Sequence, residues 1–259
     1  MTFDLVVATV DRVDTLDRLL TSLERQAHRD FRVLIVDQND DDRLTDAIVA
    51  HGALQIVHLR SGRGLSRARN AALPSLTADA VAFPDDDCIY EPDLLARVAA
   101  RFGADPELDG LTGREPTWTT GPAMLTRDNL WKRAISFTIF LRRRVVDDVG
   151  TFDESLGLPA ASGEEIDYLV RALDSGARIE YDPSLVVDHD RKLNADEFGV
   201  REGKSLGYIL RKHRYPKRTV MRLLIRPVGG TVVALAHRDG RQARFHLDTL
   251  RGRLRGYLS

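Results

Sequence analysis

Apolar runs and helix-like segments alternate through the first half of the chain. FDLVVAT (residues 3–9) and FRVLIVD (31–37) are continuous apolar runs with the length of buried strands. The segment between them repeats leucine at the spacing of one helix face. The same order continues beyond the second run. We therefore predict strands at 3–9, 31–37, 54–59 and 78–83, and helices at 14–26, 44–50, 65–76 and 91–102.

The second half of the chain has a less regular pattern, and residues 115–127 are expected to form a loop. Strands that alternate with helices predict an α/β fold with a mostly parallel central sheet flanked by helices. In such sheets, ligands bind beyond the carboxyl ends of the strands. Further strands are expected at 108–114, 136–142, 178–181 and 185–187, and further helices at 163–175 and 198–214.

The composition is typical of a packed domain. Of the 259 residues, 43% are hydrophobic and 30% are charged. The single cysteine, Cys88, excludes an internal disulfide and suits a reducing cytosol. The N-terminal segment lacks the pattern of a signal peptide, and no uncharged apolar run reaches the ~18 residues of a membrane span. We expect a cytoplasmic protein, at the inner face of the membrane if its tail binds lipid, without a membrane-spanning helix.

Charge is distributed unevenly along the chain. Residues 200–259 hold 15 Lys and Arg against 3 Asp and Glu, whereas residues 1–199 carry a net charge of -13. We predict that residues 199–259 form a basic, mainly helical C-terminal extension. Two interpretations of it stay open. Basic residues beside apolar ones suit contact with an anionic membrane, and they also suit packing on the rest of the chain or on a second subunit.

Three adjacent aspartates, Asp85, Asp86 and Asp87, follow a predicted strand directly. Their carboxylates repel one another, so a cation beside them would lower the energy. A hard divalent ion prefers oxygen ligands and often binds through carboxylates plus substrate phosphates. An acidic turn with one aspartate as a helix N-cap would give the same pattern. We predict a divalent-metal site, with His189 at a later strand end as a further metal or pyrophosphate contact.

Other polar residues at predicted strand ends favour a nucleotide ligand. Thr9 and Asp11 follow the first strand, and Asp37 ends the second, a position from which an acid meets a sugar hydroxyl or a base. A helix start carries Arg67 and Arg69, which could hold phosphate oxygens or be solvated. The G-x-G-x-x-G and P-loop patterns do not occur, which disfavours a Rossmann dehydrogenase.

Glu164, Glu165 and Asp167 occupy the first turn of a predicted helix. The helix dipole favours acids there, which is a purely structural explanation. Alternatively, one of them is a general base that removes a proton from an attacking hydroxyl. Trp118, in the predicted loop, could stack on a sugar face or pack within the loop.

Six segments in this order, followed by a late histidine, resemble family 2 glycosyltransferases of the GT-A fold. The resemblance covers about residues 3–190, roughly three-quarters of the chain. Each motif is short, but their common order is specific. The segments are VVATVDR (6–12), VLIVDQND (33–40), GLSRARNAAL (64–73), FPDDD (83–87), VGTFDESLG (149–157), GEEIDYLVRAL (163–173) and the late His189.

This resemblance implies an inverting transferase that uses a nucleotide-diphosphate sugar, with UDP- or dTDP-linked donors favoured in the family. It implies a divalent cofactor, Mn²⁺ or Mg²⁺, and an acceptor hydroxyl on a glycan or lipid-linked molecule. A carboxylate base would deprotonate that hydroxyl, and its oxygen would displace the nucleotide in one step.

The resemblance also implies roles for residues. The family's Glu-Asp pair falls on Glu164 and Glu165, so Glu165 takes the base position, with glutamate in place of aspartate, and Glu164 is the other candidate. We assign Trp118 and Asp167 to acceptor binding. At the donor, Thr9 and Asp11 would border the nucleoside and Asp37 would contact the base, while Arg69 or Arg67 would approach the nucleotide or its phosphates. Asp86 would lie near the ribose or sugar, and Asp85 is also assigned to donor binding. Asp85, Asp87 and His189 would hold the metal, with Asp87 as the likeliest direct ligand.

The expected organisation is a catalytic domain over residues 1–198, with a nucleotide-binding half (1–103) and an acceptor-binding half (104–198). One alternative is a sugar-nucleotide pyrophosphorylase-like enzyme, although the usual glycine-rich basic start is missing. Another is a non-catalytic protein that binds nucleic acid through the basic tail. Such a protein has no need of the strand-end aspartates, so no nucleic-acid partner is expected. The oligomeric state stays open.

Overall fold

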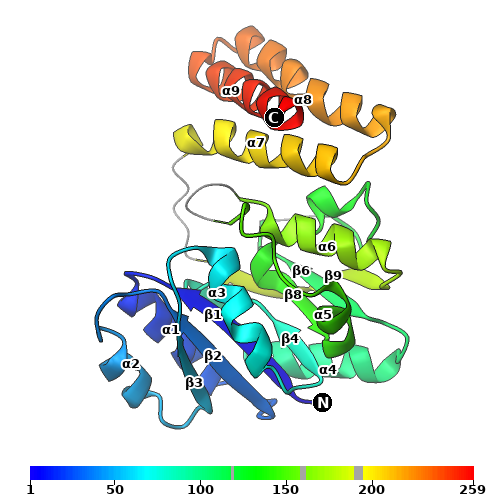
Figure 1. The fold of residues 1–259 in the computed structure, drawn as a ribbon. Helices are drawn as coiled ribbons and strands as arrows, with labels where there is room; N and C mark the ends of the chain where they lie inside the picture. Colours follow the sequence, from blue (N-terminus) through cyan, green and yellow to red (C-terminus); the bar gives the residue numbers. More distant parts are fainter. Residues whose placement is uncertain (118–119, 158–161, 190–194) are drawn as a thin grey trace. The chain divides into compact units, whose positions relative to one another are not determined.

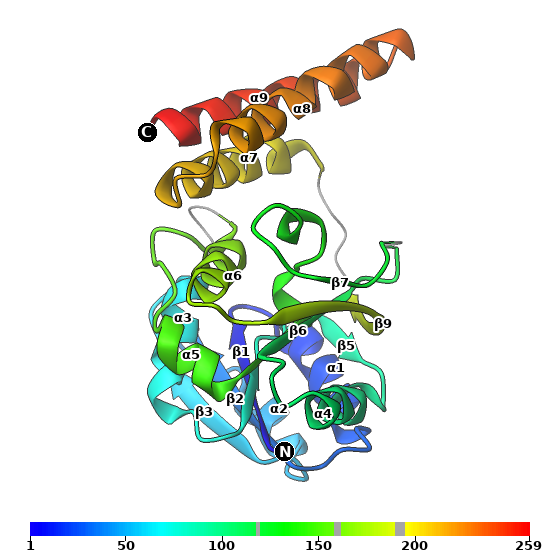
Figure 2. The same cartoon turned by 90° about the vertical axis from the view of Figure 1, so that its right-hand side faces the viewer.

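The computed structural model describes residues 1–117, 120–157, 162–189 and 195–259, without the side chains of 195–199 and 201–202. Its strands form a sheet in the order β3-β2-β1-β4-β8-β6-β9-β5, and β7 pairs with β9 (Figure 1 and Figure 2). The predicted α/β fold with a mostly parallel sheet and a helical C-terminal region is confirmed. The strands are β1 (Phe3–Thr9), β2 (Phe31–Asp37), β3 (Ile56–Arg60), β4 (Ala80–Ala82), β5 (Cys88–Tyr90), β6 (Gly110–Arg114), β7 (Ala123–Met124), β8 (Ile139–Arg142) and β9 (Ile179–His189), and the helices are α1 (Val13–Glu24), α2 (Thr45–Ala50), α3 (Leu65–Ala72), α4 (Leu94–Ala104), α5 (Arg143–Val149), α6 (Glu164–Asp174), α7 (Ala195–Lys212), α8 (Lys217–Ala236) and α9 (Gly240–Leu258).

The half of the sheet that carries most of the predicted strand ends is parallel. β1 pairs in parallel with β2 and β4, and β2 pairs in parallel with β3. Leu5 and Val33 belong to one core cluster with leucines of α1 and α4, whereas the equally buried Val6 and Leu34 point to the opposite face. Because both faces are buried, these strands appear in the sequence as continuous apolar runs. Their carboxyl ends lie at one edge of the sheet.

Strand β9 is continuous over 11 residues, where the sequence predicted two short strands. The interruption in the pattern is Pro183, which cannot donate to a neighbouring strand. The register between β6 and β9 shifts between Thr112 and Arg114, and Arg114 Nε donates to the Pro183 carbonyl at 2.7 Å. Beyond this irregularity β9 pairs with β5 up to His189. The change of partner allows the strand to continue through the proline.

Other elements also differ from the sequence prediction. The pattern did not predict β5 or α5. The predicted strand at 136–142 begins at Ile139, because the preceding residues form a 3-10 turn in which Thr138 Oγ1 donates to the Ile135 carbonyl at 2.9 Å. Such side-chain bonds compete with strand pairing. The predicted loop at 115–127 contains β7, which pairs with β9.

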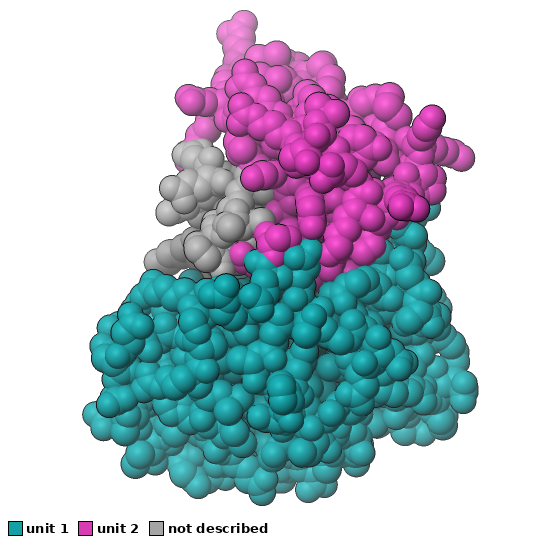
Figure 3. All heavy atoms as spheres, in the orientation of Figure 1, with its two compact units in different colours: residues 1–154, 168–191 teal, residues 155–167, 192–259 magenta. Residues whose placement is uncertain are grey.

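The chain divides into two compact units (Figure 3). The first comprises residues 1–154 and 168–191, and the second comprises residues 155–167 and 192–259. The division falls inside α6, so the first turn of this helix belongs to the second unit together with α7, α8 and α9. The second unit therefore includes residues that precede the predicted C-terminal extension.

Helices α7 and α9 approach each other at glycines. Gly203 and Gly207 on α7, and Gly252 and Gly256 on α9, recur at four-residue spacing. A Cβ atom at any of these positions would overlap backbone atoms of the facing helix. Only glycine allows two helix backbones this close, and small residues at this spacing are a known means of close helix packing.

Helix α8 runs without a break through Pro227. Proline has no N–H, so the carbonyl of Leu223, four residues earlier, loses its helical donor. The guanidinium of Arg253 on α9 donates to that carbonyl. Burial, together with the charge of Arg226, lowers the pKa of Arg253 to about 10. A side chain from another helix thus replaces the bond that the proline removes.

Helix α8 is long and apolar enough to cross a membrane by length and composition, a feature that the sequence analysis did not predict. Its most apolar stretch of 18 residues has a mean hydropathy of 1.4. However, 39% of its most apolar stretch is buried inside the protein, and core helices pass the same test.

The glycine contact predicts that Gly207→Ala lowers the free energy of unfolding by about 2 kcal/mol or more, because the added methyl group forces α7 away from α9. Gly229→Ala is the matched control, since a Cβ there meets nothing within 4 Å and should leave stability equal or higher by up to ~1 kcal/mol. Urea denaturation followed by circular dichroism measures both. Equal effects of the two substitutions would contradict the packing described for α7 and α9.

The contact between Arg253 and Leu223 predicts an energetic coupling with Pro227. Arg253→Met should leave the Leu223 carbonyl without a donor, at a cost of about 1–3 kcal/mol. In a Pro227→Ala background, the restored backbone N–H can donate to the Leu223 carbonyl. Arg253→Met should therefore lower the free energy of unfolding by at least ~1 kcal/mol less than it does in the wild type. A double-mutant cycle by urea denaturation measures the difference, and a coupling near zero would show that the guanidinium does not replace the missing bond.

Candidate active site

Several strand ends supply the side chains of the candidate site. Thr9, at the end of β1, pairs in register with Asp37 at the end of β2. The acid triplet, defined as Asp85 to Asp87, follows β4, which is the parallel neighbour of β1 on its other side. β5 then pairs antiparallel with β9 and sets Cys88 opposite His189. Strand pairing thus gathers residues that are far apart in the sequence.

Arg12 provides positive charge at the acid triplet. Its Nη1 atom lies 2.9 Å from both Asp86 Oδ1 and Asp87 Oδ2. Both carboxylates are buried. Burial raises the pKa of Asp86 despite the opposing effect of Arg12. Burial also acts to raise the pKa of Asp87, but His189 and Arg12 outweigh it and the pKa is lowered. Asp87 is therefore the more firmly ionised of the two.

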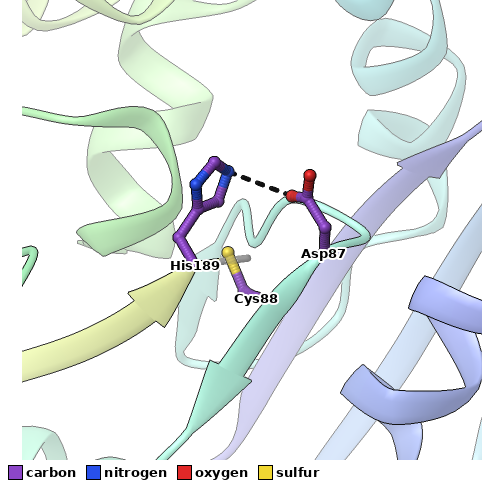
Figure 4. Close-up of side chains that lie close together, drawn as sticks. All are labelled: Asp87, Cys88 and His189. Atoms are coloured by element: carbon purple, nitrogen blue, oxygen red, sulfur yellow. Dashed lines mark ion pairs between the residues drawn. The ribbon is translucent and has the colours of Figure 1, made fainter. Parts of the chain in front are cut away.

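His189, at the end of β9, faces Asp87 of the acid triplet (Figure 4). Its Nε2 atom lies 3.0 Å from Asp87 Oδ1 and 3.9 Å from Asp85 Oδ2. The ring of Phe137 stacks on the imidazole, with centroids 4.6 Å apart and planes 5° apart, which fixes the orientation of the ring. Burial lowers the pKa of His189, but Asp87 and Asp85 outweigh this effect and raise it overall.

Asp87, Cys88 and His189 place an oxygen, a sulfur and a nitrogen within 4.8 Å of one another (Figure 4). Burial raises the pKa of the Cys88 thiol well above its usual value, so the sulfur stays protonated and is the weakest ligand of the three. Carboxylate oxygens and an imidazole nitrogen suit divalent ions such as Mn²⁺. The sequence prediction did not include Cys88.

The residues present fit a bound cation. Within the described part of the chain, Asp87 Oδ1 is buried and has no hydrogen bond of acceptable geometry, although His189 Nε2 lies 3.0 Å away. A buried carboxylate oxygen without a donor is costly. A cation between Asp87 and His189 would remove that cost, with Asp85 as a further oxygen ligand.

Arg69 is a buried arginine that contacts Asp85 of the acid triplet. The side chain is buried, and its guanidinium lies 5.6 Å from the centre of the Phe83 ring and 5.4 Å from that of Phe152. It donates to Ser136 Oγ and lies 3.4 Å from Asp85 Oδ1. Burial between two rings explains how an arginine can lie inside the fold. It orients Asp85 in this structure, and its predicted contact with the nucleotide stays a prediction.

Asp37 is fully buried and bound by protein groups. Its Oδ2 atom lies 3.0 Å from His58 Nε2 and 3.2 Å from Arg60 Nη1. Its Oδ1 atom accepts from the backbone N–H and the side-chain amide of Asn39 at 2.9 and 2.8 Å. The predicted contact of Asp37 with a nucleotide base would be made within this network of donors.

Asp11 adopts a left-handed backbone conformation, with φ at 58°. Aspartate tolerates this conformation better than most residues, and the Asp11 N–H donates to Asn39 Oδ1 at 2.8 Å. Its carboxylate lies 2.8 Å from Arg43 and 3.0 Å from Arg63. The turn that presents Asp11 is therefore tied to the loop after β2, and the predicted contact with the nucleoside stays a prediction.

Arg67 is exposed and lies 3.2 Å from Glu154. One turn later on α3, the side chain of Asn70 accepts from the Phe152 N–H at 2.7 Å and donates to the Phe152 carbonyl at 3.0 Å. These contacts fasten the segment around Phe152 to α3. The structure thus gives Arg67 a partner within the protein, and its predicted role at the phosphates stays a prediction.

The predicted acids of α6 belong to the second compact unit. Glu164 is buried and Glu165 is partly exposed. Asp167 is fully buried, and its Oδ1 atom lies 2.7 Å from Lys212 Nζ and 2.7 Å from His213 Nε2. These contacts tie the start of α6 to α7. Trp118, the other residue assigned to the acceptor, lies outside the described residues.

Besides Cys88, sequence analysis missed three contributors to the site. Arg12 is part of the VVATVDR segment, and a basic residue just after the first strand was the available signal. Phe137 and Ser136 were placed in a predicted strand, and nothing local marks them as neighbours of His189 and Arg69. Their position follows from long-range packing alone.

Comparisons with known proteins place the chain in a family. The family described as glycosyl transferase family 2 matches residues 4–151, more than half of the chain. The chain is 27% identical over 218 residues to a pre-mycofactocin glycosyltransferase of Mycobacterium tuberculosis, covering 76% of this chain and 44% of the relative. It is 30% identical over 161 residues to a PGL/p-HBAD biosynthesis glycosyltransferase of Mycobacterium bovis, covering 58% of this chain and 63% of the relative.

Solved structures agree on the fold. The mannosyltransferase PcManGT from Pyrobaculum calidifontis, described in complex with GDP-Man and Mn²⁺, matches with a TM-score of 0.68 at 16% identity, covering 97% of this chain and 86% of that one. TarS of S. aureus matches with a TM-score of 0.65 at 17% identity, covering 97% of this chain and 55% of that one. From the family match over residues 4–151, we conclude that the chain belongs to glycosyl transferase family 2.

Proposed function

We propose that the chain transfers a sugar from a nucleotide-diphosphate donor to a hydroxyl of a glycan or lipid-linked acceptor, by a single displacement that inverts the anomeric carbon. The observation that carries this proposal is the buried pair of Asp87 Oδ1 and His189 Nε2, 3.0 Å apart beside the acid triplet. Solved relatives of the same fold are described with GDP-Man and Mn²⁺ and with UDP-GlcNAc. They support a sugar nucleotide as the donor class.

Asp87, His189 and Asp85 are the proposed holders of a divalent cation, Mn²⁺ or Mg²⁺. Such a cation supplies positive charge for the diphosphate as it departs. Phe137 and Arg69 fix the orientation of His189 and Asp85, so these side chains do not have to reorganise during the reaction. Arg12 adds a fixed positive charge beside Asp86 and Asp87.

The nucleoside is proposed to lie at the ends of β1 and β2, beside Thr9, Asp11 and Asp37. Asn39 and His58 already contact the Asp37 carboxylate and hold it in one position. In that position it is proposed to contact a nucleotide base or a sugar hydroxyl. UDP- and dTDP-linked sugars remain the proposed donors. A thermal-shift series of UDP-, dTDP- and GDP-sugars with and without Mn²⁺ identifies the donor, because a ligand of the native state raises the melting temperature.

Glu165 is the proposed general base, and Glu164 is the second candidate. A base must reach the acceptor hydroxyl and accept its proton as the oxygen attacks. Glu165 is the more exposed of the two, whereas Glu164 is buried. Exposure favours Glu165 because the base has to meet an acceptor that arrives from solvent.

The metal assignment predicts that Asp87→Asn weakens Mn²⁺ binding in the presence of UDP by about 100-fold or more, since loss of an outer-shell partner alone costs up to that much. Asparagine keeps the shape of the side chain and removes its charge. Isothermal titration measures the affinity without turnover. Asp46→Asn, on the exposed start of α2, is the matched control and should bind as the wild type does. Wild-type affinity in Asp87→Asn would refute the assignment.

The base assignment predicts that Glu165→Gln lowers turnover by roughly 100-fold or more, because the variant cannot accept the proton. Donor affinity should stay near the wild-type value, since the loss concerns the transition state. Release of nucleoside diphosphate and donor titration measure the two quantities. Glu164→Gln is the comparison. If it loses turnover while Glu165→Gln does not, Glu164 is the base.

A further inference from the structure

Helix α8 carries an apolar stripe on its outer face. Met221, Ile225, Val228, Val232 and Leu235 follow one another at alternating steps of four and three residues, which places them on one line along the helix. Each of these side chains is between 42% and 62% exposed. We call this line the outer stripe.

The outer stripe is separate from the face by which α8 packs. Val220, Leu223, Leu224 and Ala234 are buried on the inner side of the same helix, as are Thr219, Pro227 and Thr231. The core of the second unit therefore already has its apolar side chains from α8. None of the residues of the outer stripe is among the buried residues of that core. A contiguous exposed apolar surface of this kind marks an interaction site.

Positive charge accompanies the outer stripe. Arg218, Arg222 and Arg226 form a parallel line one position further along the helix, and all three residues are exposed. The sequence from residue 203 to residue 238 contains no Asp or Glu and nine Lys and Arg. An apolar surface bordered by arginines and free of acids matches a partner that is apolar and anionic.

From this charge pattern we propose that the outer stripe of α8 docks on an anionic membrane surface, with its apolar side chains between the lipid headgroups. A second copy of the chain fits less well, because stripe-to-stripe pairing would bring two arginine lines together. Nucleic acid fits less well because the stripe lacks the aromatic side chains on which bases stack.

The helix lies on the bilayer rather than across it. Arg222 and Arg226 sit within the apolar segment, and a spanning helix would carry both charges into hydrocarbon at high cost. The inner face is occupied by packing within the second unit. A helix with one packed face, one exposed apolar face and arginines along the boundary suits the interface plane. This docking is independent of the proposed donor chemistry, and a lipid-linked acceptor would be found at the same surface.

Flotation of the full chain with vesicles tests the proposal. At about 0.1 M salt the wild type should bind vesicles with roughly 30% phosphatidylglycerol and should not bind pure phosphatidylcholine. Binding should weaken at about 0.5 M salt, because screening reduces the attraction of arginine to lipid headgroups. Ile225→Asp combined with Val232→Asp should reduce binding by about tenfold or more, since both exposed anchors are lost and negative charge is added.

Val49→Asp on α2 is the matched control, since it places the same substitution at a 73% exposed apolar residue outside the stripe, and it should bind as the wild type does. Circular dichroism and donor titration confirm that the stripe variant is folded and separate this proposal from the donor chemistry. Equal vesicle binding by wild type and a folded stripe variant would overturn the proposal. So would a wild-type dimer that the stripe substitutions convert to monomer without any vesicle binding.

Discussion

The structure of the candidate site depends on the balance of charge around a buried acid triplet. Two of its carboxylates are almost inaccessible, and in a buried setting their repulsion is not screened by water. Arg12 forms ion pairs with Asp86 and Asp87. His189 pairs with Asp87, and the buried Arg69 lies close to Asp85. Burial raises the pKa of Asp86, whereas His189 and Arg12 outweigh burial at Asp87 and lower its pKa. The contacts also leave Asp87 and His189 facing each other, and these two residues are the proposed holders of a further cation.

Sheet topology makes this balance achievable. The acid triplet follows β4. His189 lies about a hundred residues later in the sequence, and the pairing of β9 with β5 places it beside the triplet. The ring of Phe137 then fixes the imidazole, and the hydroxyl of Ser136 binds the guanidinium of Arg69. Membership of glycosyl transferase family 2 supports the proposed sugar transfer over the pyrophosphorylase-like and nucleic-acid-binding alternatives.

The second unit is stabilised by contacts between helices that contain glycine and proline. Its helices contain residues that usually weaken helices, namely the glycines of α7 and α9 and Pro227 of α8. The glycines allow backbone contact, and Arg253 supplies the bond that the proline removes. Because the inner face of α8 is packed, its outer stripe is available for a partner. Arginines alongside that stripe make a negatively charged surface the best physical match.

The sequence alone determined the features that depend on neighbouring residues. Apolar runs predicted the parallel strands, helical spacing predicted α1 and α4, and position after a strand predicted that Asp85, Asp87 and His189 belong to one site, which the structure brings together. Tertiary structure alone decided that Arg12 bridges two carboxylates of the triplet and that Arg69 is buried between two aromatic rings. It also decided that β9 continues through Pro183 and that α8 continues through Pro227. Each of these depends on a partner distant in the chain. Local pattern contains no information about such a partner, because only the pairing of strands and the packing of helices bring it within a few Å.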